Sequence, residues 1–260
     1  MKTLIIIPSR LSATRLPGKP LLKINGLSII SHVFKKAEET NIGEVFVATQ
    51  DQEIIDDVKK NGGQAILTSK NHKTGTDRIN EAIKKLGKTD VELVLNLQGD
   101  EPLMNVADIQ KLHDQMVKTK FELGTLASNI TDQESYDNLN VVKVITKESL
   151  DNSQFPEAIN FARKLNDKPK NIYKHLGIYC YTLKTLEKFV SFNQSVNEIK
   201  YKLEQLRALD NEIKINVAFA KSSPIGVDTK EDFVAIKKIM EYKSKWIKYI
   251  FKELLEHIRI

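Results

Sequence analysis

The chain has 260 residues, of which 41% are hydrophobic and 28% charged, and its net charge is +6. This length and composition suit one large α/β domain with a hydrophobic core, with or without a small added lobe. A single cysteine, Cys180, excludes an internal disulfide and a thiolate metal cluster, and no apolar run approaches the ~20 residues that span a bilayer.

The start of the chain lacks the pattern of a signal peptide, so we expect a cytoplasmic protein. Its basic residues are interleaved with 34 acids, which favours a basic site for an anionic substrate over a nucleic-acid surface. Cys180 lies in an apolar stretch, where we expect it to be a small buried side chain.

The first expected strand is the apolar run 4–7, which should stop at Pro8 because proline cannot donate to a sheet ladder. A polar loop and then an amphipathic helix at about 27–40 follow. The loop carries hydroxyls and three cations: Arg10, Ser12, Thr14, Arg15 and Lys19. Such a loop can direct amides, hydroxyls and cations at one polyphosphate. A solvated basic turn is the alternative, but the loop's prolines and glycine give it a rigidity that a connector does not need.

Strands and helices then alternate along the chain. We expect strands at 45–49, 64–68 and 91–97, and helices at 52–60 and 79–86. Gly62-Gly63 should end the first of these helices, with one glycine in the left-handed conformation. The alternation predicts a doubly wound, mostly parallel, Rossmann-like sheet.

The segment 72–78, just before the helix at 79–86, carries further candidate contacts for a nucleotide: Thr74, Gly75, Thr76 and Arg78. Gly75 allows the backbone to approach a ligand closely, and Thr76 is the expected helix N-cap. An ordinary capped turn is the alternative interpretation.

Carboxylates follow two of the expected strands. The segment Gln98-Gly-Asp-Glu-Pro102 comes directly after 91–97, at the edge where open α/β sheets bind ligands. Asp100 suits a Mg²⁺ ion that bridges a triphosphate, although a polar turn is the alternative. Asp228 follows the strand expected at 212–220 and is free to face the site, because Thr229 and Asp232 form the capping pair of the next helix.

The pattern changes from about residue 131 to 190, where strand-like segments outnumber helices. We expect a small antiparallel lobe there, with apolar positions such as Leu176, Ile178 and Tyr179 covered by a second copy of the chain. A helix is expected at 105–119, a strand at 121–130 and another helix at 197–209. The tail beyond 240 predicts a basic amphipathic helix, which either packs on the domain or lies on a membrane surface.

The segment 7–21, with Arg10, Arg15 and Pro17-Gly18-Lys19, resembles the Arg-(x)n-Arg-x-Pro-Gly-Lys signature of sugar nucleotidyltransferases. Its form is similar to that of the cytidylyltransferases acting on 3-deoxy-manno-octulosonate (KDO). Three more motifs occur in that family's order: 98–102, 174–181 with 204–207, and 226–229. The resemblance implies the nucleotide-diphospho-sugar transferase fold in a single domain over 1–260, with the lobe at about 131–190 and a C-terminal extension at about 241–260.

The resemblance also implies an activity, namely transfer of CMP from CTP to the anomeric 2-hydroxyl of KDO, an eight-carbon acidic sugar, for lipopolysaccharide synthesis. The implied catalytic residues are Arg10, Arg15, Lys19, Asp100 and Asp228, the last two holding Mg²⁺. Implied nucleotide contacts are Pro8, Arg10, Ser12, Thr14, Arg15, Lys19, Thr74, Gly75, Thr76, Arg78 and Asp100. Implied sugar contacts are Gln98, Arg163, His175, Tyr181, Glu204 and Gln205.

Some positions leave alternatives open. The chain has Ala162-Arg163-Lys164-Leu165 where the family often has Ser-Arg-Ala. By residue type alone His175 is equally a core or surface histidine, and Glu204 and Gln205 can simply face solvent. The rival functions are a cytidylyltransferase for a related sugar such as 8-amino-KDO, and a non-catalytic nucleotide- or nucleic-acid-binding module. We expect a homodimer that binds no nucleic acid and touches a membrane, if at all, only through its terminal helix.

Overall fold

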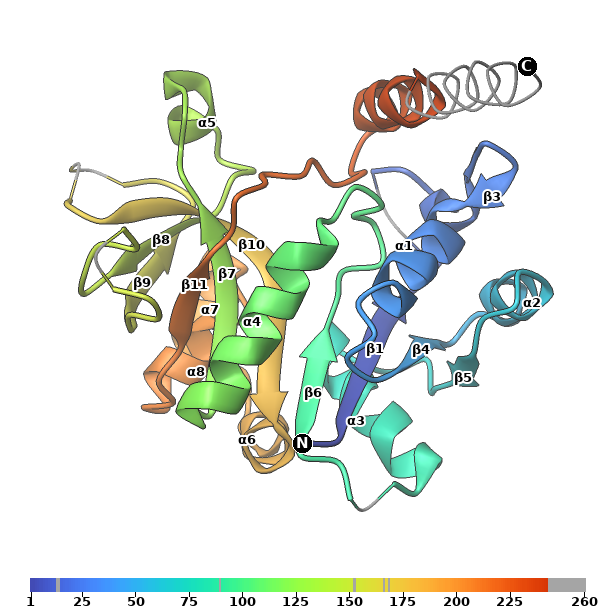
Figure 1. The fold of residues 1–260 in the computed structure, drawn as a ribbon, viewed down its shortest axis with the longest axis horizontal. Coiled ribbons are helices and arrows are strands. Elements are labelled where there is room, and N and C mark those ends of the chain that lie inside the picture. Colours follow the sequence, from blue (N-terminus) through green and yellow to red (C-terminus); the bar gives the residue numbers. More distant parts are fainter. Residues whose placement is uncertain (13–14, 89, 152, 166, 168, 243–260) are drawn as a thin grey trace, which may run out of the picture.

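The structure is a computed structural model, which describes residues 1–12, 15–88, 90–151, 153–165, 167 and 169–242 (Figure 1). Thr14 and most of the terminal extension predicted at 241–260 lie outside these residues. Within the described part, no helix is long and apolar enough to cross a membrane.

A mixed sheet forms the centre of the molecule. Its main path runs in the order β11-β7-β10-β6-β1-β4-β5. The strands are β1 (Thr3–Ser9), β4 (Glu44–Thr49), β5 (Ala65–Leu67), β6 (Leu93–Asn96), β7 (Leu123–Ser128), β10 (Ile172–Thr182) and β11 (Asn216–Phe219). Only β10 on this path is antiparallel to its neighbours, among the described residues. The predicted mostly parallel, doubly wound fold is therefore confirmed.

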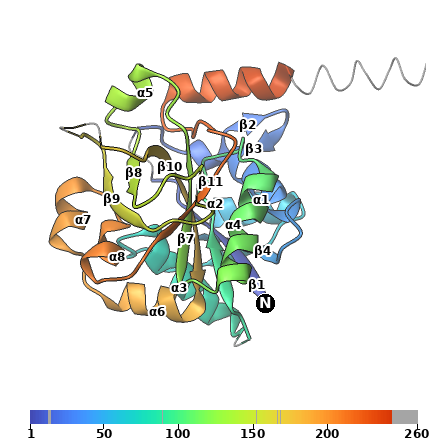
Figure 2. The ribbon, with the colours of Figure 1, turned by 60° about the vertical axis from the view of Figure 1, so that its left-hand side comes forward.

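Helices cover both faces of the sheet because its strands alternate their apolar side chains. In β1, Ile5 and Ile7 face a core shared with three helices, and Leu4 and Ile6 face the core on the other side. The first three helices are α1 (Ile29–Glu38), α2 (Gln52–Lys60) and α4 (Val106–Thr119). The opposite face packs against α3 (Gly75–Leu86), α6 (Leu183–Ser191) and α8 (Leu206–Asp210). Figure 2 shows the sheet between α6 and α8 on one side and α1 and α4 on the other.

The antiparallel part predicted at 131–190 is present, but it is continuous with the main sheet. β8 (Lys143–Thr146) pairs with β10, and β9 (Ala158–Ala162) pairs with β8. The short helix α5 (Gln133–Asp137) precedes them. The strand β10 itself lies between β6 and β7, so this region is an extension of the sheet rather than a separate one.

The first strand is longer than predicted and includes Pro8, which is paired with Ala48 of β4. The carbonyl of Ile6 accepts a hydrogen bond from Leu97 N–H, on the side of β6. Backbone groups two residues apart face the same side of a strand, so an N–H at position 8 would also face the β6 side. Pairing with β6 has ended by then, at Ile6. The proline therefore costs no ladder bond.

Two expectations about helix ends were wrong. Thr74, not Thr76, is the N-cap of α3: its hydroxyl accepts from Asp77 N–H, and Asp77 accepts from Thr74 N–H in a capping box. The helix expected at 197–209 is broken into α7 (Val196–Tyr201) and α8, because Lys202 takes a φ of 54° and ends α7.

Other predicted features agree with the structure. Gly62 has a φ of 84°, and Cys180 is fully buried. Thr229 and Asp232 form the predicted cap of a helix at 230–242. The last strand is shorter than the expected 212–220, because only Asn216–Phe219 pairs with β7.

A third small core joins the beginning of the chain to its end. Ile24 and Ile29, near the hairpin of β2 (Lys23–Ile24) and β3 (Leu27–Ser28), pack with Val227 and Ile236. Figure 1 shows the helix at 230–242 lying beside this hairpin and α1. This packing places the segment containing Asp228 next to the basic loop that follows β1.

Candidate active site

A cavity of about 350 Å³ opens at the carboxyl ends of β1 and β6. From these adjacent strands the chain continues toward opposite edges of the sheet, from β1 to β4 and from β6 to β7, and such a switch in strand order is where α/β sheets bind ligands. Its lining comes from four segments: Pro8, Ser9, Arg10, Ser12, Arg15, Lys19, Pro20; His72, Lys73, Thr74, Gly75, Arg78; Gln98, Gly99, Asp100; and Asp228. Most of the predicted nucleotide contacts are therefore brought together.

The basic loop is closed on itself and anchored to the domain. Gly18 N–H donates to Leu11 C=O at 3.1 Å, and Leu11 N–H donates to the Asp51 carboxylate at 2.7 Å. Gly18 has a φ of 71°, which glycine adopts without strain. Lys19–Leu21 then form a single 3-10 turn, η1, with Pro20 buried. These features give the loop's cations a defined position at the cavity.

Lys19 lies between the two predicted metal ligands. Its ammonium donates to Asp100 Oδ2 at 2.5 Å, to Asp228 Oδ1 at 3.2 Å and to Val227 C=O at 2.8 Å. Arg15 contacts the other Asp228 oxygen at 3.0 Å. Burial by itself lowers the pKa of Lys19, but the two carboxylates raise it above its ordinary value, so this lysine is a firmly charged cation.

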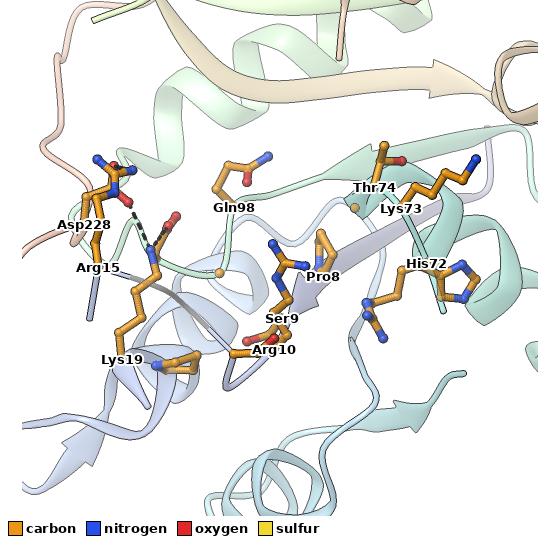
Figure 3. Close-up of a pocket in the computed structure, with 16 residues that line it drawn as sticks. Pro8, Ser9, Arg10, Arg15, Lys19, His72, Lys73, Thr74, Gln98 and Asp228 are labelled. Atoms are coloured by element: carbon orange, nitrogen blue, oxygen red, sulfur yellow. Dashed lines mark hydrogen bonds and ion pairs between the residues drawn. The ribbon is translucent and has the colours of Figure 1, made fainter. Parts of the chain in front are cut away.

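The opposite end of the cavity is the first turn of α3. Figure 3 shows Thr74 with His72 and Lys73 at one end, Arg15, Lys19 and Asp228 at the other, and Arg10 between them. Arg78, from the same turn, is buried and donates to Thr68 Oγ1 at 2.5 Å and Gln50 Oε1 at 2.9 Å. Desolvation lowers the pKa of Arg78 below its ordinary value. Exposed amides at a helix N-terminus favour an anion here.

Gln98 projects into the cavity from the end of β6 (Figure 3). Its amide donates to Gly177 C=O at 2.9 Å, where β10 shifts register between Leu176 and Tyr179. A β-carbon at position 177 would come within 3.2 Å of Gln98 Cγ. The irregularity in β10 and its glycine thus hold the Gln98 side chain in place.

The other predicted sugar contacts do not line this cavity. His175 is buried and bonds Thr125 Oγ1 at 2.9 Å, while burial raises the pKa of both Tyr181 and Glu204, whose side chains lie near the Thr76 hydroxyl. Gln205 is buried at the start of α8. Arg163 lies elsewhere, with its guanidinium on Leu139 and Lys202 carbonyls. Thr76 is likewise buried behind the cavity rather than in its lining.

Several residues at the site were missed by the sequence reasoning. Ser9, His72 and Lys73 all line the cavity, and Lys73 adds a cation. Glu101 has a buried Oε2 that lacks a hydrogen-bond partner among the described residues, and burial beside Asp100 raises the pKa of its carboxyl to about 8. Their positions in the segments 9–12, 72–78 and 98–102, which had already been singled out, were the available signal.

The lining brings together five cations, Arg10, Arg15, Lys19, Lys73 and Arg78, and two carboxylates, Asp100 and Asp228. An excess of positive charge with a helix N-terminus suits a polyphosphate, and two carboxylates at one end suit a divalent cation bound with it. Fold and site together define a nucleotidyltransferase of the α/β class.

Comparison with known proteins narrows this class. The family model described as "Cytidylyltransferase" matches residues 4–215. The 3-deoxy-manno-octulosonate cytidylyltransferases of Afipia carboxidovorans and Thermodesulfovibrio yellowstonii are each 40% identical to the chain, over 242 and 255 residues. These alignments cover 92% and 94% of this chain and 96% and 100% of the relatives. The chain belongs to the 3-deoxy-manno-octulosonate cytidylyltransferase family.

Solved structures agree with this placement. A CMP:2-keto-3-deoxy-manno-octonic acid synthetase complexed with CTP superposes with a TM-score of 0.84 at 32% identity, covering 94% of this chain and all of that one. A UDP-glucose pyrophosphorylase complexed with UDP-glucose superposes with a TM-score of 0.70 at 16% identity, which shows a shared fold only.

Proposed function

We propose that this protein transfers CMP from CTP to the anomeric 2-hydroxyl of KDO, with release of pyrophosphate. Family membership supports the reaction, and one observation in the structure carries it. That observation is the group of Lys19, Asp100 and Asp228 facing the N-terminus of α3 across a single basic cavity. CMP-KDO would serve lipopolysaccharide synthesis. We place the reaction in the cytoplasm because CTP is made there.

A Mg²⁺ ion fits the donor set at Asp100 and Asp228, which we propose as its protein ligands. The charged Lys19 ammonium is already held there by oxygens of Asp100, Asp228 and Val227, so the position favours a cation. Among the described residues no group of three or more acidic, histidine or cysteine side chains is placed to hold a metal. Two carboxylates are nevertheless sufficient for Mg²⁺ when substrate phosphates complete its coordination.

The protein's own part in the reaction is positioning and charge neutralisation. The sugar hydroxyl attacks the α-phosphorus and pyrophosphate leaves in line, so negative charge builds up on the phosphates. Arg10, Arg15 and Lys19 would hold these oxygens, with the α3 amides at the far end. When bound, Mg²⁺ polarises the phosphate and lowers the pKa of a coordinated hydroxyl. Lys19 and Arg15 would then exchange their bonds to the carboxylates for bonds to phosphate.

The sugar-binding role of Gln98, His175, Tyr181, Glu204, Gln205 and Arg163 remains a proposal. One feature supports it for Glu204, whose buried Oε1 has no hydrogen-bond partner among the described residues. An acceptor left in this state is costly unless a ligand supplies a donor, and a sugar hydroxyl is such a donor. Arg163 is the weakest member of the group, because its guanidinium is already bonded to two carbonyls away from the cavity.

The test is pyrophosphate release from each of the four nucleoside triphosphates, with KDO and Mg²⁺. We expect release with CTP, little with the other three, and none without KDO or Mg²⁺. Turnover with no preference for CTP would contradict the cytidylyl assignment. Binding of CTP without any release would favour the non-catalytic nucleotide-binding module instead.

KDO must also be separated from close analogues. We expect a higher kcat/KM for KDO than for its 8-amino analogue in a competition assay that quantifies both CMP-sugar products. This expectation rests on the relatives, which are named for 3-deoxy-manno-octulosonate. A preference for the amino sugar would move the assignment to that related cytidylyltransferase.

We also propose that the protein is a homodimer, through residues other than those first expected. Leu176, Ile178 and Tyr179 are buried within the chain and are not available to a partner. Four apolar side chains of β9 and α7 are largely exposed instead, namely Ile159, Val196, Ile199 and Tyr201. This surface borders a hollow between β9, α7 and α8, and a second copy of the chain would remove it from water.

Light scattering after size-exclusion chromatography tests the dimer. We expect twice the chain mass for the wild type and a shift toward monomer for the Val196→Glu, Ile199→Glu double variant. The matched control is Ile225→Glu, which changes an apolar side chain exposed elsewhere. A wild-type monomer at micromolar concentration would remove this proposal.

A further inference from the structure

Arg207 is a buried cation that lies outside the cavity. Its Nε and Nη2 donate to the two oxygens of Glu198 at 2.7 and 2.6 Å, and its Nη1 lies 3.6 Å from Asp77 Oδ1. The guanidinium also lies 4.6 Å from the centre of the Phe189 ring. All three guanidinium nitrogens thus contact a carboxylate, a planar geometry that lysine cannot reproduce.

The two acids that Arg207 pairs with, Glu198 by hydrogen bonds and Asp77 by charge, play the same role in two different helices. Asp77 is the third residue of α3 and completes its capping box by accepting from Thr74 N–H at 3.2 Å. Glu198 is the third residue of α7 and accepts from Ser195 N–H at 3.2 Å in the same way. Arg207 therefore joins the first turns of two helices that are far apart in the sequence.

One of these turns forms an end of the cavity. Thr74, Gly75 and Arg78 line it, and Gly75 lies next to Pro8 of β1, since a β-carbon there would be in van der Waals contact with Pro8 Cγ at 3.4 Å. A small displacement of the turn would therefore move its amides relative to the loop that follows β1. Asp77 has its backbone in this turn but is not part of the cavity lining, and its Oδ1 is the atom that contacts Arg207.

We propose that Arg207 is a positioning residue for the nucleotide: through Asp77 it fixes the first turn of α3 at the distance from the basic loop that a bound triphosphate requires. The inference rests on the proposed function only for the identity of the nucleotide. Arg207 acts through another residue, so it should affect the affinity for CTP more than the rate of the bound complex.

The variant that isolates this contact is Asp77→Asn. The amide oxygen of asparagine can still accept from Thr74 N–H, so the cap remains, but the charge that faces Arg207 is gone. We expect the Kd for CTP, measured by calorimetry without KDO, to rise about tenfold, with kcat within threefold of the wild type. Asp77→Glu keeps both the charge and the capping-box chemistry, so it should restore CTP affinity to within threefold.

A second variant, Arg207→Lys, keeps the charge but loses the fork. We expect the same weaker CTP binding, and the double variant Asp77→Asn, Arg207→Lys should bind CTP no worse than the weaker single variant. The matched control is Asp210→Asn, which likewise neutralises a carboxylate that accepts a hydrogen bond, here from Asn197 of α7 on the surface, and leaves Arg207 untouched. Urea unfolding of each variant shows whether it is folded under the assay conditions.

The outcomes separate positioning from simple stabilisation. If Asp77→Asn binds CTP within twofold of the wild type, or if it loses stability alone, the proposal is overturned. If Asp77→Glu binds CTP as weakly as Asp77→Asn, the charge is not responsible and the proposal also fails. A wild type that does not release pyrophosphate refutes the proposed function instead, and the CTP affinities of the variants still test the positioning role.

Discussion

Neutralising Asp100 or Asp228 tests the centre of the proposed site. Replacement by asparagine keeps the shape of the side chain and removes one negative charge. If these two residues hold a single Mg²⁺ that contributes several kcal/mol to the transition state, either change should lower turnover about a thousandfold, or roughly 4 kcal/mol. Because both act through the same ion, the double variant should lose little more than the worse single variant.

The structure also gives the sign of the change in stability. Two carboxylates without a cation would repel each other, so neutralising one would stabilise the protein. Lys19 lies between them, and this reverses the expectation. Asp100 makes the shorter contact and its side chain is 28% exposed, whereas Asp228 is 45% exposed. We therefore expect Asp100→Asn to lower the free energy of unfolding by about 1 kcal/mol, and Asp228→Asn by less.

The assay is pyrophosphate release at increasing Mg²⁺ concentration, together with urea unfolding in the absence of nucleotide. Asp114→Asn is the matched control, because that carboxylate is 79% exposed on the outer surface of α4. Near-normal turnover in either single variant would refute the metal assignment. Losses that add fully in the double variant would show that the two carboxylates act separately.

Three further predictions concern charge, protonation and packing. Replacing Lys19 by Met removes the cation between Asp100 and Asp228. Mn²⁺ should then bind the nucleotide-free protein about tenfold more tightly, while CTP should bind more weakly. An unchanged Mn²⁺ affinity, measured by electron paramagnetic resonance, would contradict this. Burial lowers the pKa of His175 to about 3. Between about pH 6.5 and pH 3 this histidine is therefore protonated in the unfolded chain but neutral in the folded one. The free energy of unfolding should fall by about 1.4 kcal/mol per pH unit as the pH drops from 6.5 toward 3. In the His175→Gln variant, the urea midpoint should depend less on pH over this range than in the wild type. A β-carbon at Gly124 would lie 2.8 Å from Phe155 Cζ and 2.9 Å from Met116 Sδ, so Gly124→Ala should cost about 1–3 kcal/mol in thermal or urea unfolding; an unchanged midpoint would show that these side chains move aside freely.

The sequence was most informative where local chemistry and fold topology agree. Alternating apolar runs located the parallel strands, and residues that follow strands meet at one edge of a parallel sheet. For that reason Asp100 and Asp228, far apart in the chain, could be expected at one site, and both do contact Lys19. The capping pair of Thr229 and Asp232 was equally readable, because it depends on neighbours only.

The features that sequence could not provide depend on tertiary contacts. Nothing local distinguishes β10 as a strand inserted between β6 and β7 from a strand of a separate lobe. The break at Lys202 needs a positive φ at a residue that rarely adopts one, so the helical pattern concealed it. Lys19 was expected on phosphate; its bonds to both carboxylates follow from the third core, which packs the two chain segments together.

The insertion of β10 also determines when the sheet can be completed during synthesis. β1, β4, β5, β6 and β7 all precede residue 129, but β6 and β7 have no contact in the ladder until residues 172–182 pair with both. A nascent chain that ends earlier therefore presents one unpaired edge of β6 and both edges of β7, which waits for β11 as well, and each can pair with another chain. Joining β6 to β7 through β10 and completing the Gln98 contact to Gly177 are the same event. A chain without β10 thus lacks both a fixed Gln98 and a partner for the facing edges of β6 and β7.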